Sequence, residues 1–254
     1  MEINIRALSD FLQCPLIYKF KYIDKLVPHR QYLIYEAFEQ AMHQLFYYLF
    51  YQVQNSYYPS SYHLKQAWGR IWCPNRSREQ IIGHLYSNAQ KISYSPRAKE
   101  RQGLELGLAM KDYYKNKSGT PILIGKAYTV PIGRHTVFGI IELVREIDQQ
   151  LEIIDARTSM RRIPVAHLKH DIEITAASFA TRYLLRTKEA RVIGYYIEGN
   201  KQIITTRGQE DYEVLNKILS RVEKAIKQGL WWPSMSESCS ICSFRPQCAK
   251  GNWY

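Results

Sequence analysis

The hydrophobic pattern divides the chain into three parts, of which the first is mainly helical over residues 7–117. Within it, the stretch 32–57 contains neither glycine nor proline and is dense in large apolar residues. Such a stretch predicts a buried helix, and Pro59 is expected to end it.

The second part begins near residue 121, where the pattern becomes that of β-strands. The segments PILIGKAYTVPI, HTVFGIIELVREI and QLEIIDA are rich in β-branched residues and are separated by GR and DQQ. They predict three strands, the first two of which form a hairpin. Further on, RVIGYYIEG and KQIITT predict a strand pair around GN.

Two amphipathic helices complete the pattern. One is expected over 165–186 and the other over 209–229, where apolar residues recur at helical spacing. The apolar face of the first helix is formed by Val165, Leu168, Ile172, Phe179 and Tyr183. We therefore expect a single α/β domain over 1–254, with a mainly helical part over 7–117, a sheet with an inserted helix over 121–206, and a C-terminal helix and cysteine segment over 209–254.

The charge of the chain points to a polyanionic partner. Lys and Arg number 35 against 23 Asp and Glu, which gives a net charge of +12. The basic residues are spread along the chain, which favours a groove lined by several segments over a basic tail. A merely soluble basic surface is the alternative. The 20 tyrosines could stack on unpaired bases, although such side chains more often belong to the core.

The N-terminal sequence shows no basic stretch followed by an apolar one, and no apolar run is long enough to cross a bilayer. We therefore expect a cytoplasmic protein without a membrane partner. In that compartment, clustered cysteines bind metals more often than they form disulfides.

Cysteines are concentrated near the C-terminus. Three of the five lie in the run CSICSFRPQC, at Cys239, Cys242 and Cys248. Four thiolates suit a metal ion or an iron–sulfur cluster, so a fourth ligand is expected elsewhere. Cys14 and Cys73, each followed by proline, are the candidates.

Two acids lie on adjacent predicted strands, Glu142 on one and Asp155 on the next. Arg157 follows two residues after Asp155 and should point to the same face of its strand. The two carboxylates could share a divalent cation such as Mg²⁺. Ordinary solvent-exposed charges at the strand ends are the alternative.

Four stretches, in order, resemble the iron–sulfur branch of the PD-(D/E)XK nucleases, which includes nuclease domains of RecB and AddB type and the CRISPR adaptation nucleases. They are LSDFLQCPLIYKFKYIDKL, AFEQAMHQLFYYL, GIIELVREIDQQLEIIDARTS and GLWWPSMSESCSICSFRPQC. The resemblance implies a restriction-endonuclease-like fold, in which helices flank a central mixed sheet.

The resemblance also implies the residues of two sites. Mg²⁺ or Mn²⁺ would be held by the side chains of His43, Glu142 and Asp155 and the backbone carbonyl of Ala156, with Arg157 as the catalytic cation. A [4Fe–4S] cluster would be held by Cys14, Cys239, Cys242 and Cys248. A zinc ion at the same cysteines is the alternative.

The chain departs from the family pattern at several positions. Glu142 stands where Asp is usual, and Arg157 where Lys is usual. Glu39 replaces a small residue four positions before the histidine, and Thr175 and Phe179 replace a glutamine and a tyrosine. The charges that bind metal and phosphate are retained, but the groups that handle water are not.

The sequence therefore leaves two alternative functions. One is a metal-dependent DNA exonuclease that acts on single strands or frayed ends. The other is an inactive iron–sulfur subunit that binds DNA or a helicase, integrase or CRISPR partner. Two further expectations concern packing: the tryptophans Trp231 and Trp232 should pack over the cysteine segment, and the acids Glu146, Asp148 and Glu152 should lie at the surface.

Overall fold

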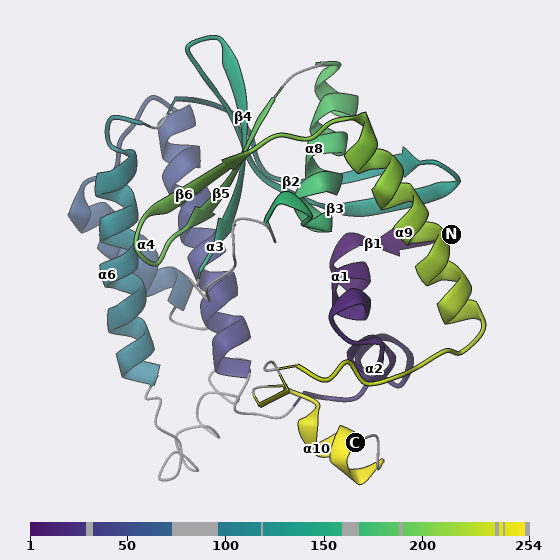
Figure 1. Ribbon diagram of the computed structural model, residues 1–254. Helices are drawn as coiled ribbons and strands as arrows, with labels where there is room; N and C mark the ends of the chain where they lie inside the picture. Colours follow the sequence, from purple (N-terminus) through teal and green to yellow (C-terminus); the bar gives the residue numbers. More distant parts are fainter. Residues whose placement is uncertain are drawn as a thin grey trace.

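The protein has three layers, with a mixed sheet between two groups of helices (Figure 1). This arrangement confirms the expected α/β fold class. Among the described helices, none is both long and apolar enough to cross a membrane. The computed structural model describes residues 1–28, 33–72, 96–117, 119–158, 168–187, 190–236, 239–240 and 242–251.

The sheet contains the strands that the β-branched segments predict. The hairpin is formed by β2 (Thr120–Ile132) and β3 (His135–Ile147), and β4 (Gln150–Arg157) continues antiparallel to β3. Next to β4 lies β5 (Arg191–Tyr196) in parallel orientation, and β6 (Lys201–Thr205) pairs antiparallel with β5.

One face of the sheet is covered by helices from the N-terminal half. These are α3 (Leu33–Gln54), α4 (Ser61–Trp72) and α6 (Pro96–Tyr114). Their side chains form a core with the sheet in which Phe46 and Trp68 are almost completely buried. The predicted buried helix over 32–57 is thus present as α3.

The other face is covered by α1 (Ile5–Gln13), α8 (Ile172–Leu185) and α9 (Gln209–Lys227). The apolar stripe predicted for α9 faces the sheet, but the helix predicted over 165–186 is interrupted at 170–171, between the helical residues 168–169 and α8. Asp171 starts it, because its carboxylate accepts the N–H groups of Glu173 and Ile174. Val165 lies outside the described residues, and Tyr183 is 55% exposed and does not belong to the core.

A fork in the sheet positions the candidate site. β4 pairs with β3 only up to the pair Leu143–Ile154, after which residues 155–157 pair with β5 alone. On the same side of β3, β1 (Glu2–Asn4) pairs in parallel with residues 136–138. Residues 139–142 of β3 therefore lie between the ends of β1 and β4, unpaired with either.

The turn from β1 into α1 fits closely against this fork. Asn4 ends the strand and caps the helix, since its side chain accepts the N–H groups of Arg6 and Ala7. A Cβ at Gly139 would lie 2.8 Å from Cγ2 of Ile5 and 2.7 Å from the hydroxyl of Tyr128. The glycine thus allows α1 to start directly above the open part of β3.

Glu152 corrects one expectation, because it is buried and not at the surface. Its carboxylate accepts hydrogen bonds from Nε and Nη2 of Arg145, at 3.1 and 2.8 Å. Arg145 is only 3% exposed, and its guanidinium also lies over the ring of Tyr114. Residues from two strands and α6 thus surround a buried ion pair, which hydrophobic pattern alone could not show.

We expect Glu152→Ala to reduce the free energy of unfolding by about 3 kcal/mol, because it leaves the Arg145 guanidinium buried without its carboxylate. Urea denaturation would measure this. The matched control is Glu105→Ala, which breaks the exposed pair of Arg101 and Glu105 and should change stability by less than about 0.5 kcal/mol. Equal effects of the two substitutions would contradict the prediction.

Candidate active site and cysteine pocket

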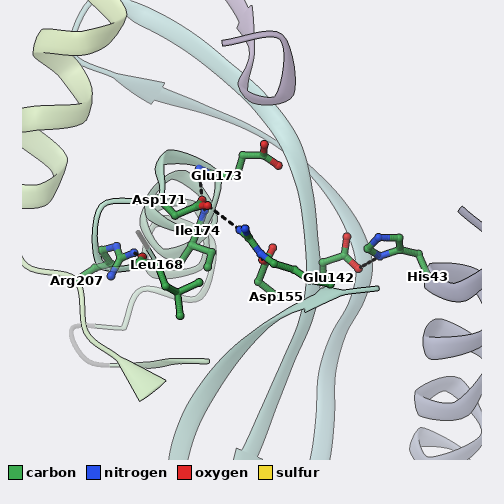
Figure 2. A network of polar contacts seen from close by, with 9 residues as sticks. His43, Glu142, Asp155, Leu168, Asp171, Glu173, Ile174 and Arg207 are labelled. Carbon is green, nitrogen blue, oxygen red and sulfur yellow. Dashed lines mark hydrogen bonds and ion pairs between the residues drawn. The ribbon is translucent and has the colours of Figure 1, made fainter. Parts of the chain in front are cut away.

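Glu142 and Asp155 lie at the mouth of the fork, one on each of the diverging strands (Figure 2). Both carboxylates are partly buried, with side chains 16% and 20% exposed. Burial raises the pKa of Asp155, and the negative charges of Asp171 and Glu142 raise it further, so Glu142 lies close enough to act on Asp155. The structure places Glu142 on β3 and Asp155 on β4, and whether the two acids share a metal ion stays a prediction.

Helix α3 holds Glu142 from one side. Nδ1 of His43 lies 2.9 Å from Oε2 of Glu142, and the hydroxyl of Tyr47 donates to the same oxygen at 2.9 Å. Burial lowers the pKa of His43, but the hydrogen bond and the charge of Glu142 outweigh it, and the pKa is raised. Tyr47 was not predicted; its spacing of four residues from His43 on a helix is the signal that could have identified it.

Glu39, the departure four residues before His43, forms an ion pair with Arg6 at the start of α1. Nη2 of Arg6 and Oε2 of Glu39 are 3.5 Å apart, and both side chains are substantially exposed. The unusual acid thus connects α1 and α3 next to the site.

Asp155 is bound to Arg157, as the alternation of a strand predicts. Nε of Arg157 donates to Oδ2 of Asp155 at 2.6 Å. Burial raises the pKa of Asp155, and Arg157 lowers it only in part, because Asp171 and Glu142 add negative charge nearby. A buried carboxylate in this situation is stabilised by positive charge, and here the guanidinium supplies it.

Asp171 is the second partner of Arg157, and the sequence prediction missed it. Nη2 of Arg157 donates to Oδ2 of Asp171 at 2.8 Å, while Oδ1 of Asp171 caps α8. An aspartate directly before an apolar helical stretch is a recognisable helix start. Its contact with a residue of β4 depends on tertiary structure.

Glu173, in the first turn of α8, adds a further acid. Burial and the neighbouring charge of Asp155 raise the pKa of Glu173 to about 7, although a hydrogen bond from Ser9 acts in the opposite direction. Near neutral pH this carboxyl group is therefore partly protonated, next to the other acids of the fork.

Two positions of α8, where the resemblance leads one to expect a glutamine and a tyrosine, hold Thr175 and Phe179 instead. Thr175 is 5% exposed; its hydroxyl donates to the carbonyl of Asp171 at 2.7 Å and accepts from Nε of Arg207 at 2.8 Å. Arg207 also donates to the carbonyl of Leu168 at 2.6 Å. Phe179 packs against Tyr212 of α9. A buried arginine from the β6–α9 connection thus supports the start of α8.

The fork therefore brings together His43, Glu142, Asp155 and Arg157. The side chain of Ala156 is buried on the opposite face of β4, in the core formed with α3. Whether its carbonyl binds a metal stays a prediction.

The four predicted cysteines line one pocket, although Cys14 is more than two hundred residues from the others in sequence. Cys14 lies between α1 and α2 (Pro15–Tyr18), and Cys248 lies in α10 (Arg245–Lys250). Leu16, Phe20 and Phe244 form a small apolar cluster beside them. Cys73, the rival fourth ligand, lies outside the described residues.

Backbone groups and neighbouring thiols surround the sulfurs. The N–H of Ser234 donates to Sγ of Cys14 at 3.4 Å, and the Cys239 thiol donates to the carbonyl of Ser234 at 3.7 Å. Burial raises the pKa of the Cys248 thiol, and negative charge on the other cysteines of the pocket raises it further. Four thiolates here would repel one another unless a cation lay among them.

Of the two tryptophans, Trp231 packs beside the cysteine pocket as expected, whereas the ring of Trp232 packs on α1. Trp231 stacks on Tyr18 and contacts the small apolar cluster. Trp232 packs edge-on against Phe11, with its side chain 47% exposed. Within the described part of the chain, however, no three His, Cys, Asp or Glu side chains are arranged to hold a metal ion. The metal and cluster predictions therefore stay predictions.

Comparison with solved structures gives matches of low similarity. A crystal structure of SSO0001 is 10% identical with a TM-score of 0.41, and the match covers 98% of this chain and 86% of the other. A protein from Eubacterium rectale, presented as a candidate exonuclease, is 12% identical with a TM-score of 0.49, over 95% of this chain and 86% of the other. At these values neither structure bears on function. A search of curated proteins found no match.

A family model gives a definite result. The model described as the PD-(D/E)XK nuclease superfamily matches residues 2–249, which include the fork, α3, α8 and the cysteine run. The mixed sheet flanked by helices is consistent with the fold of that family. The chain therefore belongs to the PD-(D/E)XK nuclease superfamily.

Proposed function

We propose that this protein is a divalent-metal-dependent deoxyribonuclease. The observation that carries the proposal is the pair of neighbouring carboxylates, Glu142 and Asp155, on the two diverging strands of a chain that belongs to a nuclease superfamily. Nucleases of this superfamily usually use Mg²⁺ or Mn²⁺. Carboxylate oxygens are the ligands that both ions prefer.

The donor types at the fork, two carboxylates and an imidazole, suit such an ion, although the three side chains are not arranged around one point in this structure. Glu142, Asp155 and His43 would hold it together with the carbonyl of Ala156, and when bound it would polarise the scissile phosphate and acidify a water molecule. The side chains around the two acids orient the Glu142 carboxylate and neutralise negative charge at the site. His43 and Tyr47 fix the Glu142 carboxylate, and Arg157 places a permanent positive charge beside Asp155.

The proposed substrate is DNA with unpaired ends. The net charge of +12 favours binding to phosphates. Such binding does not depend on the base sequence of the DNA. Several aromatic side chains are exposed and available to stack on unpaired bases. They include Tyr51, Tyr57, Tyr62, Tyr183 and Trp232. A helicase or CRISPR integrase partner stays an expectation from the resemblance.

We further propose that the cysteine pocket holds a [4Fe–4S] cluster. Support comes from the donor set, because Cys14, Cys239, Cys242 and Cys248 line one pocket and their charges act on one another. Amide N–H groups of Ser234 and Ser236 point at two of the sulfurs, and such bonds stabilise thiolates in cluster sites. The cluster would connect α1 with the C-terminal segment.

One observation favours the inactive alternative. The Arg157 guanidinium already neutralises Asp155 at 2.6 Å, at the position where the family usually has lysine. An arginine held in this way competes with a metal ion for the same carboxylate. A DNA-binding subunit that does not cut would fit this arrangement.

The test is cleavage of end-labelled single-stranded and duplex DNA, with Mg²⁺ or Mn²⁺ and with EDTA. We expect metal-dependent shortening of single strands from an end. We also expect binding in EDTA to weaken by at least roughly tenfold between low and physiological salt, because phosphate contacts dominate it.

The outcomes separate the two functions. Binding to DNA without cleavage under either metal would support the inactive subunit and overturn the nuclease. Salt-insensitive binding would contradict phosphate recognition. Cleavage that persists in EDTA would contradict the metal requirement.

A further inference from the structure

We propose that Asp171 is a positioning residue that holds Arg157 ready to bind a DNA phosphate. The inference rests on the proposed function, since it concerns how the same fork would bind DNA. It goes beyond that function because it assigns a role to an acid outside the predicted set.

The contacts of Arg157 are divided between two carboxylates on different elements. Nε donates to Asp155 on β4 at 2.6 Å, and Nη2 donates to Asp171 at the start of α8 at 2.8 Å (Figure 2). Two acceptors on separate elements fix the plane of a guanidinium, which one acceptor would allow to rotate. Asp171 thus determines the orientation of Arg157.

This orientation leaves part of the guanidinium available. An arginine has five N–H donors, and the two carboxylates use one on Nε and one on Nη2. Nη1 makes no hydrogen bond or ion pair with any residue that the structure describes. The side chain is 23% exposed, so a ligand can reach it. The remaining Nη1–Nη2 end matches two oxygens of one phosphate.

Asp171 is itself rigidly held, as a positioning residue requires. Its Oδ1 accepts two N–H groups of α8, and its carbonyl accepts the hydroxyl of Thr175. Arg207 in turn donates to the hydroxyl of Thr175 and to the carbonyl of Leu168. These contacts extend from the β6–α9 connection to the fork, and Figure 2 shows Arg207 next to Leu168 and Asp171 next to Glu173 and Ile174.

The test measures binding of a fluorescent single-stranded oligonucleotide in EDTA over a range of salt concentrations, so that it does not depend on cleavage. The variant is Asp171→Ser, because serine also caps helices but cannot reach Arg157 as a carboxylate does. We expect Asp171→Ser to weaken binding by roughly fivefold and to reduce the salt slope by about one, as for loss of one phosphate contact.

A weaker affinity for DNA would be informative, because removal of an acid should by itself strengthen binding to a polyanion. The matched control is Asp211→Asn, which removes the first-turn carboxylate of α9 that accepts the N–H of Gly208 at 2.7 Å. The control should bind DNA as well as the wild-type protein or slightly better. Thermal melting of both variants shows whether folding is retained, and Asp171→Asn replaces Asp171→Ser if the latter does not fold.

A double-mutant cycle completes the test. We expect Asp171→Ser to cause no further loss in the background of Arg157→Ala, because Asp171 acts through Arg157. Additive losses, or binding by Asp171→Ser at least as tight as that of the wild type, would overturn the inference. Wild-type protein that binds DNA in EDTA but cuts none would overturn the nuclease and leave this inference standing. Wild-type protein that binds no DNA would overturn both.

Discussion

Asp155→Asn should abolish metal-dependent cleavage, with a loss of at least roughly a thousandfold in rate. The substitution removes the charge through which Asp155 would hold the metal, and the amide is a poor substitute ligand. Asparagine can still accept the hydrogen bond from Nε of Arg157. The guanidinium also keeps its bond from Nη2 to Asp171. The fold should therefore remain intact, so loss of activity can be attributed to the site. Initial rates on a labelled single strand would measure it.

The control for this prediction is Glu146→Gln on β3, the same strand as Glu142. Glu146 is exposed and lies where β3 and β4 are still paired, away from the mouth of the fork. Its substitution should leave the cleavage rate unchanged. DNA affinity in EDTA should not decrease in Asp155→Asn, since the substitution removes a negative charge. Cleavage by Asp155→Asn at the wild-type rate would show that the carboxylate has no role in the reaction.

Cys14→Ala should remove iron from the protein and lower its melting temperature by roughly 15 °C, which corresponds to several kcal/mol for a domain of this size. The expected cause is loss of the connection between α1 and the C-terminal segment, since Cys14 is the only pocket cysteine from the N-terminal part among the described residues. Iron analysis, visible absorption and thermal melting of anaerobically purified protein would measure the effect.

Cys73→Ala is the matched control, because it removes the other candidate for the fourth ligand. It should keep both the iron and the melting temperature. If instead Cys73→Ala bleaches the protein and Cys14→Ala does not, the fourth ligand is Cys73. Wild-type protein that contains zinc and no iron would contradict the cluster.

Much of the fold followed from the sequence because β-branched segments and amphipathic stretches report local structure directly. The strands β2 to β6 and the helices α3 and α9 lie where the pattern placed them. The helix predicted over 165–186 is interrupted, because residues 168–169 are helical but α8 starts anew at Ile172. Leu168 is buried at helical spacing from Ile172, but the Asp171 cap determines where the helix begins.

The candidate site was predictable only in part. Glu142, Asp155 and Arg157 were found because they lie on adjacent strands, and His43 through the resemblance to the family. Asp171 could not be assigned, since its link to Arg157 depends on how α8 packs against the sheet. The same holds for Arg207, whose partners lie on another element. The buried pair of Arg145 and Glu152 was missed because charged residues usually predict exposure.

The joining of the two chain ends at the cysteine pocket has a consequence for protein synthesis. Cys14 and Cys239 are 225 residues apart, and a ribosome adds about 5–20 residues per second. Leu16 and Phe20 are buried beside Phe244. Their apolar side chains therefore remain without this partner for about 10 to 45 seconds, until Phe244 has been synthesised. Nascent chains that stop before residue 239 should expose these two side chains, which makes such chains targets for chaperones until Phe244 has been synthesised and has packed against them.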